Sequence, residues 1–239
     1  MRIRCLLLGV ITLLSACASR PNAEGWIEKT IETKYLSFQV WEKEITPEQK
    51  LRIYIEGDGN PTPDKPVAFE LANRDTHQNV IYVSRPCQYV WCDECEKSAL
   101  WQEERYNAEI VEEMKKLIDY LMKKYKAPSV ELIGYDGGAT MALLLAPKLP
   151  VERVITVGGI VNTKTYATSQ KIVLNGDNPM DIKNILAQIS QVHYVGGKDK
   201  VVPRRMVEGF VDAMYKPKSV SVKIVPNATH TSWENLVIE

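Results

Sequence analysis

The stretch Val130–Ala146, which reads VELIGYDGGATMALLLA, constrains the fold more than any other part of the sequence. A short β-branched and apolar run leads into a glycine turn, and a leucine-rich segment at helical spacing follows. The pattern predicts a strand, a sharp turn and a helix. Asp136 stands at the centre of the turn, between Gly134 and Gly138. Glycines belong there because the central residue takes a strained backbone conformation and leaves no room for neighbouring side chains.

The bulk composition fits one globular domain. The chain has 239 residues, of which 45% are hydrophobic, and this is enough for a substantial core. The formal net charge is zero, which argues against a nucleic-acid partner or a polybasic membrane surface. We find no dinucleotide fingerprint, phosphate-binding loop or metal-ligand cluster, so we expect no cofactor and no metal, and a small-molecule substrate.

The N-terminus has the features of an export signal. A basic start precedes the apolar run Leu6–Leu14, which is too short to cross a bilayer. The following Leu14–Cys17 resembles a bacterial lipobox, which implies cleavage after residue 16 and lipid on Cys17. We therefore expect a signal peptide at 1–16, a lipidated cysteine and tether at 17–30, and a domain at 31–239. The implied location is the bacterial cell envelope, where a lipid anchor in the outer membrane would hold the domain facing the periplasm. The alternative is an ordinary secretory signal.

The rest of the chain alternates between strand and helix patterns. Alternating or apolar runs predict strands at 35–41, 51–55, 79–83, 154–159, 191–195 and 219–225, besides the one at 130. One apolar face predicts a helix over 101–125, and a second helix is expected over 204–215. This order predicts an α/β fold with a mostly parallel sheet and helices on both faces. Residues 160–189 are polar and mixed, so we expect a minimal cap or none.

Three cysteines lie close together at positions 87, 92 and 95. In an exported chain this spacing suggests a local disulfide, with Cys87 bonded to either Cys92 or Cys95 and one thiol left over. A redox-active or zinc-binding role for Cys92 and Cys95 would need a thioredoxin-like context or a fourth ligand, and the sequence offers neither. A structural disulfide is therefore the favoured interpretation.

Three further features follow strand patterns. The strand at 51–55 runs into the glycine-rich turn Glu56–Gly59, where a backbone N–H could stabilise an oxyanion. Asp199 follows the strand at 191–195, and His230 follows the last strand. Their order after Asp136 is nucleophile, acid, histidine. The milder alternatives are a plain turn, a solvated loop carboxylate and a loop histidine.

These features together resemble the α/β-hydrolase superfamily over nearly all of the mature chain. More narrowly, the stretches Ile55–Gly59 and Arg85–Tyr89 look like those of small exported bacterial α/β-hydrolase proteins, which typically carry serine in the elbow. The resemblance implies that Asp136 occupies the nucleophile position, that His230 is the general base and that Asp199 orients it. It also implies an oxyanion hole formed by N–H groups of Gly137 and of the Gly57–Asp58 turn.

Aspartate in the elbow changes the chemistry that is available. A carboxylate needs no deprotonation at neutral pH and can displace a leaving group at saturated carbon, as in haloalkane dehalogenases and epoxide hydrolases. Attack on a carboxylic ester would give a mixed anhydride, so ordinary serine-esterase chemistry is excluded. Three hypotheses remain. The first is an Asp-nucleophile hydrolase of epoxides or halides, and the second is an inactive homologue acting as a binding or structural lipoprotein. The third is a hydrolase of unknown substrate in which Asp136 acts as a base or as a nucleophile of unusual scope. We also expect burial and nearby carboxylates to raise the pKa of Asp136.

Overall fold

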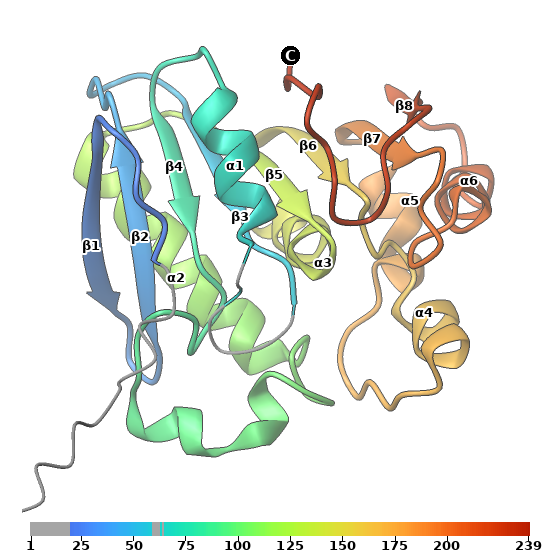
Figure 1. Cartoon of the computed structure of the whole chain (residues 1–239), viewed down its shortest axis with the longest axis horizontal. Helices are drawn as coiled ribbons and strands as arrows, with labels where there is room; N and C mark the ends of the chain where they lie inside the picture. Colours follow the sequence, from blue (N-terminus) through green and yellow to red (C-terminus); the bar gives the residue numbers. More distant parts are fainter. Residues whose placement is uncertain (1–19, 59–62, 64) are drawn as a thin grey trace, which may run out of the picture.

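The protein folds around one eight-stranded sheet (Figure 1). The computed structural model describes residues 20–58, 63 and 65–239. The strands are β1 (Trp26–Glu32), β2 (Ser37–Lys43), β3 (Leu51–Ile55), β4 (Val80–Val83), β5 (Val130–Tyr135), β6 (Val151–Val157), β7 (Ser190–Gly196) and β8 (Val220–Val225). Their order in the sheet is β1-β2-β4-β3-β5-β6-β7-β8, with β1 and β2 antiparallel and the strands from β4 to β8 parallel.

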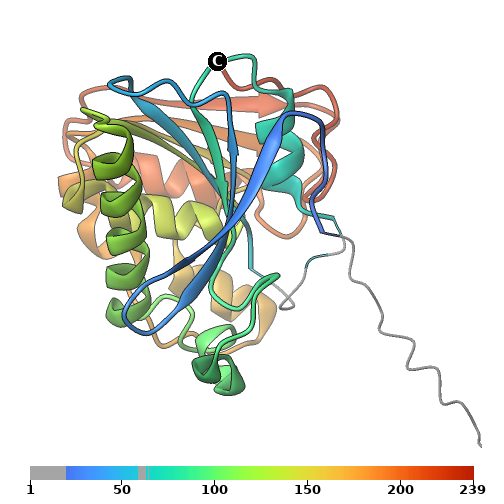
Figure 2. The same cartoon turned by 90° about the vertical axis from the view of Figure 1, so that its left-hand side faces the viewer.

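Helices cover both faces of this sheet. They are α1 (Val67–Arg74), α2 (Ala108–Tyr125), α3 (Gly137–Leu145), α4 (Thr163–Gln170), α5 (Lys183–Leu186) and α6 (Arg204–Asp212), with short 3₁₀ turns η1 (Asp93–Glu96), η2 (Ser98–Leu100), η3 (Ala146–Lys148) and η4 (Pro179–Ile182). Figure 2 shows α1 and α2 on opposite sides of the twisted sheet. Within the described residues, no helix is both long and apolar enough to cross a bilayer.

The central strands are nearly continuous apolar sequences because a hydrophobic core packs against each face of the sheet. Ile53 and Leu132 pack with α2, α3 and α6 on one face. Tyr54 and Ile133 point to the other face, where α1 and the C-terminal segment cover them. Because both faces are buried, these strands lack the polar alternation of a half-exposed strand. The predicted α/β class with a mostly parallel sheet is confirmed.

Some element boundaries differ from the sequence prediction. The long helix begins at Ala108 rather than at residue 101, because the Asn107 side chain accepts a hydrogen bond from the Ile110 N–H and caps it there. Strand β1 was not predicted, and it begins at Trp26, inside the segment that we assigned to the tether. Its exposed positions mix Ile27 and Thr30 with the charged Glu28 and Glu32, so it lacks a strand-like apolar run. Cys17 and the signal segment lie outside the described residues.

The segment between β6 and β7 is small. It contains α4, η4 and α5, and only Thr163 of α4 is buried. This agrees with the minimal cap expected from the sequence. The carboxyl ends of β3, β5, β6, β7 and β8 meet at one edge of the sheet, and in a doubly wound sheet this edge is where ligands bind.

Candidate active site

The elbow between β5 and α3 presents Asp136 on a strained turn. Asp136 has φ 50° and ψ −118°, a left-handed backbone that a non-glycine residue rarely adopts. The turn is held by its own backbone, since the Asp136 carbonyl accepts hydrogen bonds from the N–H groups of Ala139 and Ile160. A Cβ on Gly134 would collide with the Ala139 backbone, and one on Gly138 would collide with the Ile55 carbonyl. The flanking glycines are therefore required by packing.

His230 lies between two carboxylates. Its Nδ1 is 2.9 Å from Oδ2 of Asp199, and its Nε2 is 3.2 Å from Oδ1 of Asp136. Asp199 is fully buried, and its Oδ1 accepts the N–H groups of Val201 and Val202, which fix the carboxylate. The structure thus brings Asp136, Asp199 and His230 together from the ends of three different strands.

The second oxygen of Asp136 points at a backbone N–H group. Its Oδ2 lies 3.1 Å from the Asp58 N, which donates a hydrogen bond to it, and the adjacent Gly137 N–H further lowers the pKa of this carboxylate. In a serine enzyme these two N–H groups would face the oxyanion of a tetrahedral intermediate. In this chain the elbow side chain supplies the anion itself.

The two N–H groups of the Gly57–Asp58 turn point at different carboxylates. The Gly57 N–H donates to Glu56 at 2.8 Å, and the Asp58 N–H is the one that donates to Asp136. The Gly57 carbonyl accepts a hydrogen bond from the Gln88 side chain at 3.0 Å. Glu56 is fully buried, and burial raises its pKa to about 7 despite hydrogen bonds from the Gly57 N–H and the Tyr82 hydroxyl. Gly59 lies outside the described residues.

The Asp58 side chain anchors the same turn from the other side. Arg85 Nη1 lies 2.6 Å from its Oδ1, and Arg105 Nε lies 2.9 Å from its Oδ2. The Tyr106 hydroxyl also donates to this carboxylate. The Asp58 carboxylate lies directly over Gly137, where any Cβ would overlap it. Neither Arg105 nor Tyr106 was predicted to belong to the site, because nothing in their spacing links them to residue 58.

The charges of the site are strongly coupled. Burial disfavours the charged form of His230, but hydrogen bonds to Asp136 and Asp199 outweigh it and raise the pKa to about 9. Burial alone would raise the pKa of Asp136, yet the hydrogen bond and charge of His230, with the Gly137 and Asp58 N–H groups, lower it. The expectation of a raised Asp136 pKa is therefore wrong. At neutral pH the site holds an ionised Asp136 beside a protonated His230.

The three cysteines also come together near this site. Cys87 and Cys95 form a disulfide with a Cα–Cα distance of 5.5 Å, and Cys92 keeps a free thiol. This corresponds to one of the two pairings expected from the sequence. The disulfide joins the segment after β4, which carries Arg85 and Gln88, to η1.

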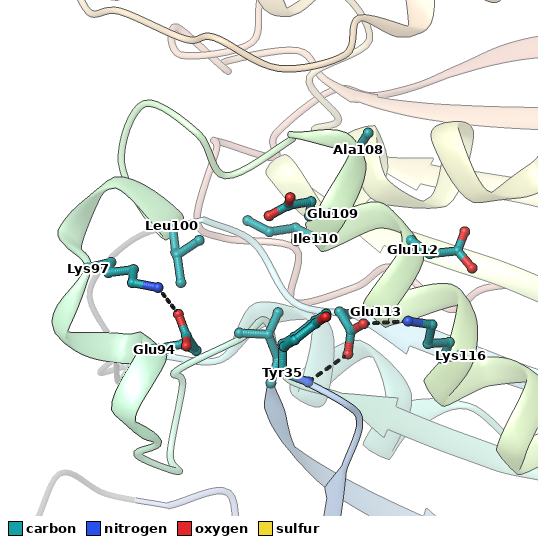
Figure 3. A pocket seen from close by; sticks show the side chains of 11 residues that line it. Tyr35, Glu94, Lys97, Leu100, Ala108, Glu109, Ile110, Glu112, Glu113 and Lys116 are labelled. Carbon is teal, nitrogen blue, oxygen red and sulfur yellow. Dashed lines mark hydrogen bonds and ion pairs between the residues drawn. The ribbon is translucent and has the colours of Figure 1, made fainter.

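A separate cavity of about 500 Å³ lies beyond η1, between the turn that joins β1 to β2 and the start of α2 (Figure 3). Leu36, Leu100 and Ile110 provide apolar lining, and two ion pairs, Glu94 with Lys97 and Glu113 with Lys116, border it. None of the predicted catalytic residues lines this cavity.

The sheet, the strained elbow and the acid–histidine pair define an α/β-hydrolase. The sequence model of the family described as "Serine hydrolase (FSH1)" matches residues 37–227, and the chain belongs to this family. The family is named for a serine nucleophile, whereas the elbow here holds Asp136. No curated protein sequence is significantly similar to the chain.

Solved structures share the fold at low sequence identity. Est1E from Butyrivibrio proteoclasticus has a TM-score of 0.64 at 10% identity, over 85% of this chain and 90% of its own. An alpha-beta serine hydrolase homologue from Coxiella burnetii has a TM-score of 0.59 at 16% identity, over 89% and 92%. The Pyrococcus horikoshii acylaminoacyl peptidase has a TM-score of 0.61 at 15% identity over 87% of this chain, which spans only 38% of that protein.

Proposed function

We propose that this protein is an Asp-nucleophile hydrolase that acts on saturated carbon bearing a leaving group, such as an epoxide or an alkyl halide. The observation that carries the proposal is the orientation of the Asp136 carboxylate. One oxygen, Oδ2, faces the Asp58 N–H, and the other, Oδ1, faces His230. This orientation suits attack by Oδ1, because Oδ2 then becomes the carbonyl oxygen of the ester and already lies at the Asp58 N–H donor.

In the first step Asp136 Oδ1 forms a bond to the substrate carbon, and the bond from that carbon to the leaving group breaks. A halide leaves with the electron pair; an epoxide oxygen keeps it and takes a proton from water. The lowered pKa of Asp136 supports this step, because the carboxylate is ionised without help from a base.

In the second step water attacks the Asp136 ester. Once Asp136 is a neutral ester, His230 loses one of the two carboxylates that raise its pKa, so the pKa falls and a neutral base becomes available. Asp199 still orients the ring through Nδ1. His230 removes a proton from water, the hydroxide adds to the ester carbon, and collapse releases the alcohol and regenerates the carboxylate.

Covalent trapping tests this proposal. We expect His230→Ala to accumulate the Asp136 ester, since the second step loses its base. Intact-mass spectrometry after incubation with small epoxides and alkyl halides should show an adduct that maps to Asp136. An epoxide adds its whole mass because no atom leaves, whereas an alkyl halide adds its alkyl group in place of one hydrogen. The matched control is Asp136→Ala with His230→Ala, which should show no adduct at this position.

A second candidate is an inactive homologue that acts as a binding lipoprotein. The observation that favours it is the ion pair of Asp136 with a protonated His230, because the resting site holds no free general base. The two proposals differ in outcome. The Asp-nucleophile proposal fails if no panel member forms an adduct and Asp136→Ser gains esterase turnover. That result would mean that the fold supports esterase catalysis but that the natural Asp136 does not react.

We further propose that the mature chain is held in the bacterial envelope by lipid on Cys17. The lipobox-like Leu14–Cys17 supports this, and a disulfide at Cys87 and Cys95 suits an oxidising compartment outside the cytoplasm. The substrate would then be a small molecule that reaches the periplasmic side of the membrane.

A further inference from the structure

The three cysteines near the active site form one cluster of sulfur atoms. Their sulfurs all lie within 4.8 Å of one another. Cys87 and Cys95 are bonded and almost fully buried, whereas Cys92 is partly exposed and carries a free thiol. The Cys92 Sγ lies 3.1 Å from the Cys95 Sγ. A free thiol is therefore in direct contact with a disulfide sulfur.

We propose that this cluster is a thiol–disulfide exchange site in which Cys95 changes partner between Cys87 and Cys92. The Cys92 thiolate attacks the Cys95 sulfur, a new bond forms between Cys92 and Cys95, and the bond to Cys87 breaks. Cys87 leaves as a thiolate and takes up the proton that Cys92 lost. One disulfide and one thiol are present before and after, so the step needs no oxidant or reductant.

Local geometry supports the exchange. Cys92 and Cys95 lie at the two ends of one tight turn, and the Cys92 N–H donates to the Cys95 sulfur at 3.3 Å. The spacing is that of Cys-x-x-Cys pairs, which form disulfides without a long loop. The competing partner, Cys87, has a left-handed backbone with φ 66°, and so does Tyr89 at φ 64°. The segment from 87 to 89 is therefore held in a conformation that non-glycine residues disfavour.

The position of the bond gives the exchange a structural consequence. Next to Cys87 lie Arg85 and Gln88, whose side chains bind the Asp58 carboxylate and the Gly57 carbonyl. On both sides of Cys95, the η1–η2 segment supplies Glu94, Lys97 and Leu100 to the wall of the cavity of about 500 Å³ (Figure 3).

The Cys87–Cys95 bond therefore links the segment that carries Arg85 and Gln88, which holds the oxyanion turn, covalently to the wall of the cavity. The alternative Cys92–Cys95 bond would close entirely within the turn at η1 and remove this tie. The exchange would thus decide whether the oxyanion turn and the cavity wall are covalently linked.

Differential alkylation of the purified full chain tests the exchange. Native protein is labelled with N-ethylmaleimide over a time course and then unfolded and reduced. The released thiols are labelled with a heavy form of the reagent, and the positions are read by peptide mapping. Cleavage at Asp93 or Glu94 separates Cys92 from Cys95. Because an alkylated Cys92 can no longer exchange, we expect the first label on Cys92 in some molecules and on Cys87 in others. A parallel digest of the labelled protein without reduction should contain a peptide with the Cys92–Cys95 bond. Label on Cys92 alone at every time, with that peptide absent, overturns the proposal.

Two single variants give an independent measurement. Cys87→Ser should form the Cys92–Cys95 bond under mild oxidation, and Cys92→Ser should retain only the Cys87–Cys95 bond. If Cys87→Ser leaves both remaining thiols open to alkylation under these conditions, the proposal is wrong. Should Cys87→Ser fail to fold, the time course on the unmodified chain decides alone. Trp91 lies beside Cys92 and packs edge-on against Trp101 with ring centroids 6.2 Å apart, so its fluorescence should differ between the two bonded forms.

Discussion

Asp136 carries a charge at the point where a serine hydrolase keeps a neutral hydroxyl. The neighbouring residues respond to this charge: His230 is protonated between two carboxylates, and the N–H groups of Asp58 and Gly137 already bind an anion. The carboxylate in the elbow is thus one of the two charged partners that hold the proton on His230, where a serine hydroxyl would leave only Asp199.

The pKa of His230 is the first quantity to measure. We expect the ring to titrate near pH 9 in the natural protein. In Asp136→Asn the pKa should be lower, because the ring keeps only Asp199 as a charged partner. NMR titration of the His230 ring in both proteins measures the difference. Equal values would show that Asp136 does not hold the proton on the ring.

The same coupling predicts how stability depends on pH. The folded pKa of His230, about 9, lies above the ordinary value of 6.5 that we assign to the unfolded chain, so protonation stabilises the fold. This contribution, on the order of 3 kcal/mol at most, is complete below about pH 6.5 and is lost as the pH rises towards 9. Urea unfolding at pH 6 and pH 9 should show a larger loss in the natural protein than in Asp136→Asn. The difference between the two losses reports the contribution of His230. Glu56, whose pKa is about 7, also titrates between pH 6 and pH 9, but it does so in both proteins.

Glycine at 137 is required by the side chain above it. In Gly137→Ala the new methyl group would overlap the Asp58 carboxylate, which Arg85 and Arg105 hold in place. We expect a loss of about 1–3 kcal/mol in the free energy of unfolding, the usual range for overpacking. The matched control is Gly209→Ala in α6, where a Cβ would meet nothing within 4 Å. This substitution should stabilise the helix by about 0.5–1 kcal/mol. Chemical denaturation of both variants measures the contrast.

At the scale of elements, one buried arginine connects several parts of the fold. Arg52 on β3 binds Asp75 at the end of α1 at 2.8 Å, Glu131 on β5, and the carbonyl of Ile238 near the C-terminus. Arg52 and Asp75 are almost inaccessible to water. A buried network of this kind contributes chiefly by fixing the relative positions of the elements that it joins.

Removing this arginine should be costly. Arg52→Leu leaves Asp75 and Glu131 buried without their main cation, and we expect a loss of about 3–5 kcal/mol in the free energy of unfolding. The control is Lys126→Leu, which removes the exposed ion pair with Glu48 and should change stability by less than about 1 kcal/mol. A loss at Arg52 no larger than at Lys126 would contradict this account. Thermal or urea unfolding measures both.

The elements that the sequence predicted well are those buried on both faces. β3 was predicted with its observed bounds, and the turn between β5 and α3 was predicted from its glycines. β1 and α1 escaped prediction for different reasons. β1 pairs through its backbone while its charged side chains remain exposed, and α1 is only eight residues long. Pairing with β2 and packing on the sheet decide these two elements, and neither effect is visible in a local pattern.

The candidate site divides in the same way. Asp136, Asp199 and His230 could be predicted because each follows a strand at the same edge of the sheet. The side chains that bind Asp58 could not, because Arg85 and Arg105 come from loops whose paths depend on tertiary packing. The pKa of Asp136 was predicted with the wrong sign, since the sequence indicates burial but not the hydrogen bonds that outweigh it.

At the scale of the whole molecule, the proposed lipid anchor on Cys17 determines the compartment in which the domain acts. We expect the natural chain to fractionate with membranes and to be extracted by detergent, and Cys17→Ala to be released into the soluble periplasmic fraction. Mass spectrometry of the mature N-terminus should find a lipid-modified Cys17. Cys5→Ala, within the signal segment, is the control and should leave fractionation unchanged. A soluble natural protein with an unmodified N-terminus would favour the ordinary secretory signal instead.

The Asp136 carboxylate at the oxyanion position determines which chemical probes can detect this protein. Fluorophosphonate and other activity-based probes react with a serine hydroxyl that a neutral histidine activates. Here the elbow offers a carboxylate, and the histidine is already protonated. In a proteome-wide survey with such probes this chain would go unlabelled, although its fold and family place it among the labelled enzymes. Electrophiles that alkylate carboxylates, such as epoxide-bearing probes, are the reagents that would make it visible.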